Sequence, residues 1–140
     1  NDVDNLESTL VALEYSYANS RPKQKFPFEA FLRNFPGMVS NFLSTVLDLT
    51  AIASGKIEGL IEETPNIWDI SAGALMIEEA GGDVTDWEGQ KIKWDITGVK
   101  KYNIIASNGI LHEQMVKALK EYRFPSLDPE DLGIEGLSRE

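Results

Sequence analysis

The residues best suited to chemistry lie in the run from Glu62 to Gly82, where acidic side chains stand before and inside the start of an expected helix. Asp69 falls in the first turn of that helix, directly after Trp68 and a turn at Thr64-Pro65-Asn66. A carboxylate there complements the helix dipole and the unpaired N–H groups of the first turn. It also lies at the carboxyl end of a strand, where α/β folds place ligand sites. The residue pattern alone leaves both interpretations open.

Two small residues in the same turn, Ala72 and Gly73, favour a helix that lies close to a neighbouring element or to a ligand. His112 is the only histidine, and the chain has no cysteine. These counts exclude a histidine-based metal cage, thiol catalysis, a cysteine-ligated zinc and a disulfide framework. We expect His112 on the exposed first turn of the last helix, without a functional role.

The charge balance limits the kinds of molecule that this chain is expected to bind. The 140 residues include 13 Lys and Arg against 23 Asp and Glu, a formal net charge of −10. An acidic chain argues against nucleic-acid binding, which requires a basic face, and suits a protein that collects divalent cations. No apolar run approaches the ~20 residues that a membrane span needs, and no signal peptide is evident, so we expect a cytoplasmic protein without membrane contacts. The chain begins without Met, so we expect either an engineered segment or a piece of a larger protein.

Short apolar runs alternate with helical patterns, which predicts one α/β domain with helices packed on a sheet. Ser44 is a suitable N-cap for a helix closed by Gly55, and Leu75, Met76, Ile77 and Ala80 give the helix after Trp68 its expected apolar side. We expect strands at 10–13, 38–43, 57–61, 83–87 and 102–106, helices at 28–35, 44–55, 68–80 and 111–122, a domain covering 1–124, and an acidic, mobile tail at 125–140.

Other side chains have structural interpretations. Trp68 is expected to pack and to support the turn that carries Asp69. Arg21, Lys23 and Lys25 lie in a proline-broken loop and are expected to form a solvated surface.

Trp68-Asp69, followed by a small-residue helix that Gly81-Gly82 closes, resembles the second signature of the inositol monophosphatase family of lithium-sensitive, magnesium-dependent phosphatases. The similarity extends upstream through Leu47 to Gly59 and downstream through Ile105 to His112, and covers roughly residues 5–122. It implies the C-terminal half of that family's layered α/β sandwich, with a mixed or mostly parallel sheet flanked by helices.

The resemblance implies a Mg²⁺-dependent phosphatase acting on a small phosphate monoester such as inositol monophosphate, with two or three Mg²⁺ ions bridging the phosphate. It makes Asp69 a metal ligand and Glu62, seven residues earlier, a ligand of the substrate's hydroxyl groups. Glu63 takes that role if the register differs by one. Ser44 and Thr45 complete the implied substrate-binding set.

The sequence departs from the family just before the helix that follows Ser44. The family shows an Arg and then a Gly-Ser or Gly-Thr pair, whereas residues 40–44 here are Ser-Asn-Phe-Leu-Ser. Leu43 therefore stands in place of the Gly, and the Arg is absent from its usual position. Backbone close to a substrate tolerates glycine best, so Leu43 predicts a reshaped pocket or an altered substrate.

The family's other metal ligands, a Glu-Glu pair and an Asp-Pro-x-Asp-Gly-Thr loop, belong to an N-terminal half of comparable length. This chain has no such loop. We therefore expect no complete catalytic set and no turnover in the isolated chain, and we expect the N-terminal half as its partner. Homodimers are frequent in the family, and the sequence does not fix the oligomeric state. The alternative is a non-catalytic domain that kept the fold and binds or regulates a partner.

Overall fold

Five strands form one mixed sheet in the computed structural model, which describes residues 3–14 and 28–123. Their order is β2-β1-β3-β5-β4; β1 pairs in parallel with β2 and β3, while β5 runs antiparallel to β3 and β4. The prediction of a mixed or mostly parallel sheet is confirmed, and the sheet is mixed. The strands are β1 (Leu10–Glu14), β2 (Met38–Ser40), β3 (Gly59–Glu62), β4 (Asp83–Asp86) and β5 (Ile104–Ser107).

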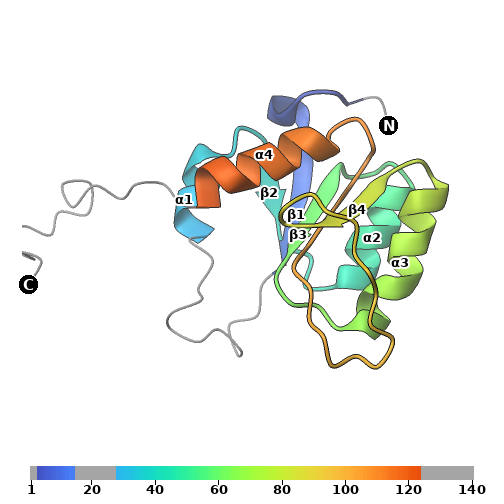
Figure 1. Cartoon of the computed structure of the whole chain (residues 1–140). Helices are drawn as coiled ribbons and strands as arrows, with labels where there is room; N and C mark the ends of the chain where they lie inside the picture. Colours follow the sequence, from blue (N-terminus) through green and yellow to red (C-terminus); the bar gives the residue numbers. More distant parts are fainter. Residues whose placement is uncertain (1–2, 15–27, 124–140) are drawn as a thin grey trace, which may run out of the picture.

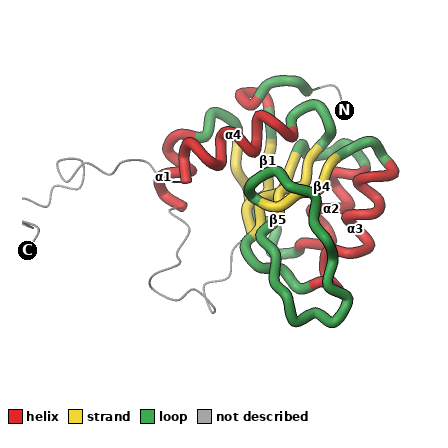
Figure 2. The backbone as a smooth tube through the Cα atoms, viewed as in Figure 1, coloured by secondary structure: helices red, strands yellow, loops and turns green. Residues whose placement is uncertain are grey.

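Helices cover both faces of the sheet, with α1 and α4 on one side and α2 and α3 on the other (Figure 1). Strands fill the layer between the two pairs of helices (Figure 2). The helices are α1 (Phe28–Asn34), α2 (Thr45–Ala53), α3 (Ile67–Glu79) and α4 (His112–Arg123), and a 3₁₀ turn, η1 (Leu6–Ser8), precedes β1.

Successive side chains along each strand point to opposite faces of the sheet, so the hydrophobic core has two parts. Ala12 and Leu60 face α2 and α3, whereas Leu13 and Ile61 face α1 and α4. All four side chains are at most 2% exposed, so neighbouring strand residues are buried on opposite faces. This explains why the strands read as continuous apolar runs.

The predicted core face of α3 is wrong in three of four positions. Leu75 and Met76 are exposed, as is Ala80, and only Ile77 is buried. The inward face instead carries Ile70, Gly73, Ala74 and Ile77, at spacings of three and four residues. The prediction selected residues for their apolar character and did not consider their positions around the helix.

Gly73 does permit a close approach. A Cβ atom there would lie 2.5 Å from the Cβ of Leu49, so glycine lets α3 rest on α2. Ala72, the other small residue, is exposed. The close neighbour at Gly73 is thus a helix.

The predicted basic surface loop with Arg21, Lys23 and Lys25 lies outside the described residues, as does the predicted acidic tail. Within the described part of the chain, no helix is long and apolar enough to cross a membrane.

Candidate functional site

Four predicted site residues meet at one edge of the sheet, where the parallel strands β1 and β3 end. Glu62 is the last residue of β3, and Asp69 lies in the first turn of α3. Ser44 caps α2, and Thr45 is its first residue. This edge therefore combines two helix N-termini, which attract anions, with carboxylates, which bind cations.

Asp69 is held at the start of α3 by Asn66. Asn66 occupies the N-cap with extended backbone, and its side-chain amide donates to Oδ2 of Asp69 over 3.2 Å. Lys101 in turn donates from Nζ to Oδ1 of Asn66 over 2.5 Å. Asp69 stays half-buried, so an ion can reach its carboxylate.

Trp68 does not pack as predicted. Its side chain is 68% exposed, and the Nζ atom of Lys101 lies 5.6 Å from the ring centroid. The ring therefore contributes a cation–π contact on the outside of the turn.

Glu62 faces Thr45, whose hydroxyl donates to Oε1 of Glu62 over 2.8 Å. The other oxygen, Oε2, is buried and has no hydrogen-bond partner. Burial raises the pKa of Glu62 to about 7; the Thr45 hydrogen bond lowers it, and the nearby charges of Glu14, Asp48 and Asp69 raise it further. Glu62, rather than Glu63, is the acid that the structure brings to Thr45.

The turn before α2 is strained at Leu43, the position where the resemblance implies a glycine. Leu43 has φ +58°, in the left-handed region, and its side chain is 85% exposed. Its N–H donates to Oε1 of Glu14 over 2.7 Å and to Oδ1 of Asn41 over 2.9 Å. Ser44 then accepts from the N–H of Leu47 over 3.4 Å, which confirms it as the N-cap.

Two further acids at this edge escaped the sequence analysis. Glu14 and Glu62 are paired positions of neighbouring parallel strands, and Asp48 lies in the first turn of α2, fully buried. Glu14 ends an apolar strand, and Asp48 reads as an ordinary first-turn acid. The pairing of β1 with β3 and the packing of α2 bring these acids together, and neither can be read from the sequence pattern.

The donor set fits magnesium only in part. Asp69 offers the carboxylate oxygens that Mg²⁺ prefers. Among the described residues, however, no group of three or more His, Cys, Asp or Glu side chains could hold a metal ion. The described residues alone therefore do not complete a magnesium site.

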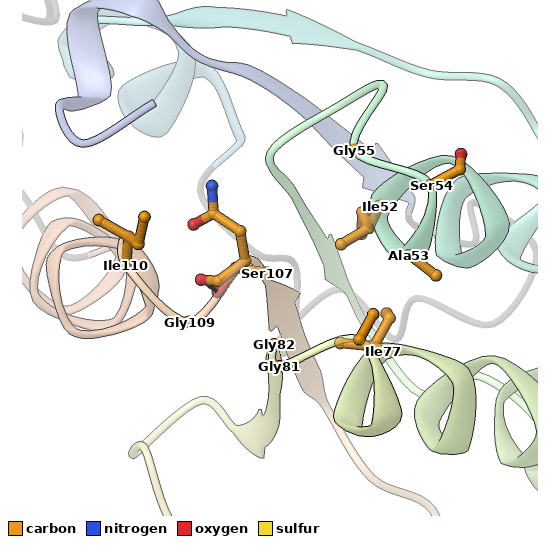
Figure 3. A pocket seen from close by; sticks show the side chains of 12 residues that line it. Ile52, Ala53, Ser54, Gly55, Ile77, Gly81, Gly82, Ser107, Gly109 and Ile110 are labelled. Carbon is orange, nitrogen blue, oxygen red and sulfur yellow. Dashed lines mark hydrogen bonds between the residues drawn. The ribbon is translucent and has the colours of Figure 1, made fainter. Parts of the chain in front are cut away.

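The opposite edge of the sheet carries different chemistry. A hollow of about 340 Å³ lies there between the C-terminal ends of α2 and α3 and the end of β5 (Figure 3). Ile52, Ile77 and Ile110 approach it from separate elements, and no titratable side chain lines it. This hollow therefore has no groups for acid–base or metal chemistry.

The prediction that His112 is exposed is wrong. The ring is 6% exposed; Nε2 lies 2.8 Å from Oγ1 of Thr85, and Nδ1 lies 2.7 Å from Oγ of Ser107. Burial lowers the pKa of His112. The histidine ties α4 to β4 and β5, a structural role that a single sequence position could not show.

The sequence profile described as the inositol monophosphatase family matches residues 2–123. The chain belongs to the inositol monophosphatase family. An inositol-1-monophosphatase of Mesorhizobium japonicum is 36% identical over 93 residues, which are 64% of this chain and 33% of that protein. A putative Nus factor SuhB of Neisseria meningitidis serogroup A is 41% identical over 76 residues, 54% of this chain and 27% of that protein.

The fold agrees with this membership. The inositol monophosphatase structure from Anabaena superposes with a TM-score of 0.74 at 28% identity, and the match covers 91% of this chain and 48% of that one. The chain therefore spans about half the length of this solved structure and a smaller share of the two relatives named above. It shares the α/β architecture of the solved structure.

Proposed function

We propose that this chain is the C-terminal part of a magnesium-dependent phosphatase that hydrolyses a small phosphate monoester such as inositol monophosphate. The observation that carries the proposal is the convergence of Asp69, Glu62, Ser44 and Thr45 at one edge of the sheet. Membership in a family whose named relatives include a phosphatase supports it.

Asp69 is the metal ligand in this proposal, because it is a half-exposed carboxylate held in place by Asn66. Magnesium, when bound, would polarise the phosphate and supply an activated water. Asn66 fixes the rotation of the Asp69 carboxylate, and the N-terminus of α3 adds positive potential beside the phosphate position.

Glu62, Ser44 and Thr45 form the substrate side. The Thr45 hydroxyl orients Glu62 so that Oε2 remains without a partner. Oε2 is buried, so a substrate hydroxyl would reach it only after a neighbouring group moves, and would then supply the missing hydrogen bond. This arrangement supports a substrate whose leaving alcohol carries further hydroxyl groups.

The remaining metal ligands come, in this proposal, from an N-terminal half outside the chain, and the isolated chain is inactive. No group of three or more His, Cys, Asp or Glu side chains among the described residues could hold a metal ion, which supports this division. A homodimer of the joined halves and a cytoplasmic location are consistent with such an enzyme, and we expect no nucleic-acid or membrane partner.

The test is phosphate release by the protein that carries both halves, assayed with inositol 1-phosphate and other phosphate monoesters in the presence and absence of Mg²⁺. We expect Mg²⁺-dependent release, lost in Asp69→Asn by at least about a hundredfold because a ligand is removed. The matched control is Asp95→Asn, an acid on the surface loop after Trp94. Full activity of Asp69→Asn would overturn the metal assignment.

A second candidate is a non-catalytic domain that kept the fold and binds a partner. Leu43 favours it, because a strained, exposed leucine occupies the turn beside Ser44. The relative named as a putative Nus factor supports it as well. No phosphate release from any ester by the two-half protein, with Leu43→Gly equally inactive, would favour this candidate.

A further inference from the structure

Three carboxyl groups from three elements meet behind the candidate site. Glu14 and Glu62 are paired positions of β1 and β3, and their alternation with Leu13 and Ile61 turns both toward the face covered by α2 and α3. Asp48 projects from the first turn of α2, and the charge of Glu14 acts on it; the charges of Glu14, Asp48 and Asp69 all act on Glu62. No basic side chain of the described residues contributes to the charge balance of Asp48.

Asp48 is fully buried, and neither of its oxygens has a hydrogen-bond donor opposite it. The group that acts on it most directly is another acceptor, the carboxyl of Glu14. A hydrogen bond between two carboxyl groups requires a proton on one of them. An ionised carboxylate buried here without a partner would cost free energy, so the two carboxyl groups retain a proton.

The proton belongs to Asp48 because Glu14 already acts as an acceptor. Oε1 of Glu14 accepts the N–H of Leu43 over 2.7 Å. Burial raises the pKa of Asp48 to about 7, and the charge and hydrogen bond of Glu14 raise it too. Protonated Asp48 can therefore donate to the same carboxylate that holds the Leu43 turn.

We propose that a proton shared between Asp48 and Glu14 positions the N-terminal turn of α2, so that Ser44 and Thr45 reach the candidate site only while the pair is protonated. Asp48 is a positioning residue that acts through Glu14 and the Leu43 turn and touches no substrate. Ionisation places two negative charges in contact between α2 and β1, and their repulsion moves the turn away from β1. The inference rests on the proposed function only in taking Ser44 and Thr45 as substrate-binding residues. The coupling between Asp48, Glu14 and the Leu43 turn lies within this chain.

The test follows the backbone amides of Leu43 and Thr45 in the ¹⁵N-labelled chain by NMR from pH 5 to pH 9. In the wild type both amides should shift together with a midpoint near pH 7. In Asp48→Asn the side-chain amide donates to Glu14 at every pH, so the step at Leu43 should vanish with its signal at the low-pH position, while Thr45 should retain only the titration of Glu62, its hydrogen-bond partner. In Asp48→Ala the step at Leu43 should also vanish, because the titrating group has been removed. The amides of Thr85 and Ser107 report the separate titration of His112.

A wild type without a step, or an Asp48→Asn variant that titrates like the wild type, would overturn the proposal. Glu14→Gln is the second variant: it removes the neighbouring charge and should move the midpoint to lower pH, and an unchanged midpoint would also contradict the proposal. Binding of inorganic phosphate, followed on the same amides, separates the two claims. A pH step without any phosphate effect would retain the positioning role and weaken the proposed function.

Discussion

The hydroxyl of Thr45, the first residue of α2, donates to Oε1 of Glu62, the last residue of β3, over 2.8 Å. This contact joins a helix N-terminus to a strand end and orients the acid of the candidate site. Because Glu62 is 8% exposed, water replaces the bond poorly when it is lost.

Thr45→Val keeps the shape of the side chain and removes the donor. We expect a loss of about 1 kcal/mol in the free energy of unfolding, measured by urea denaturation, because a buried carboxylate loses a hydrogen bond. Thr45→Val should also raise the pKa of Glu62, because the hydrogen bond from the hydroxyl lowers it. Thr50→Val is the control, because Thr50 is exposed and bonds only to the carbonyl of Val46 on its own helix. An equal loss in both variants would contradict the account.

Leu43→Gly should stabilise the chain. Leu43 holds φ +58° with its side chain exposed, so glycine relieves backbone strain and gives up little packing. We expect a gain of up to about 1 kcal/mol in the free energy of unfolding. Phe42→Gly, at the neighbouring exposed residue, should instead lower stability by about 0.5–1 kcal/mol through lost chain entropy. A destabilised Leu43→Gly variant would show that the leucine makes contacts that the structure does not contain.

The stability of the wild type should fall as the pH rises from about 4 to about 7. The folded-state pKa values of Asp48 and Glu62 are raised to about 7, so the folded chain binds more protons than the unfolded chain across this range. His112 opposes the trend below its unfolded pKa, because burial lowers its folded-state pKa. With two carboxyl groups against one histidine, we expect a net loss of at least about 1 kcal/mol between pH 5 and pH 7.5.

Thermal or urea denaturation at each pH measures this slope, and Glu62→Gln should make it shallower. A wild type that is equally stable at pH 5 and pH 7.5 would mean that these acids are neutralised by a cation.

The sequence predicted most of the fold because local signals agreed with tertiary packing. Ser44 and Gly55 bracket α2 as predicted, and Gly55 has φ +71°, the left-handed conformation that favours glycine after a helix. The predicted strand at 57–61 starts later, at Gly59, because pairing with β1 begins there. Such boundaries depend on neighbouring strands that a linear pattern does not contain.

The site was predictable only where a motif carried it. Asp69 and Glu62 belong to a recognisable run, and both lie at the same sheet edge as Thr45. The burial of His112 depends on Thr85 and Ser107 from two other strands, and the partnership of Glu14 with Asp48 depends on how β1 and α2 pack. These relationships join residues that are far apart in the sequence, so no spacing rule reports them.

The most direct test of the central claim is where a divalent ion binds the chain. We propose adding substoichiometric Mn²⁺, a paramagnetic substitute for Mg²⁺, to the ¹⁵N-labelled wild type, Asp69→Asn and the control Asp95→Asn. The account predicts that the amides of residues 66–70 broaden most in the wild type and in the control, and that Asp69→Asn abolishes this broadening. The same broadening in Asp69→Asn, or broadening centred elsewhere in the wild type, would contradict the assignment of Asp69 as the metal ligand.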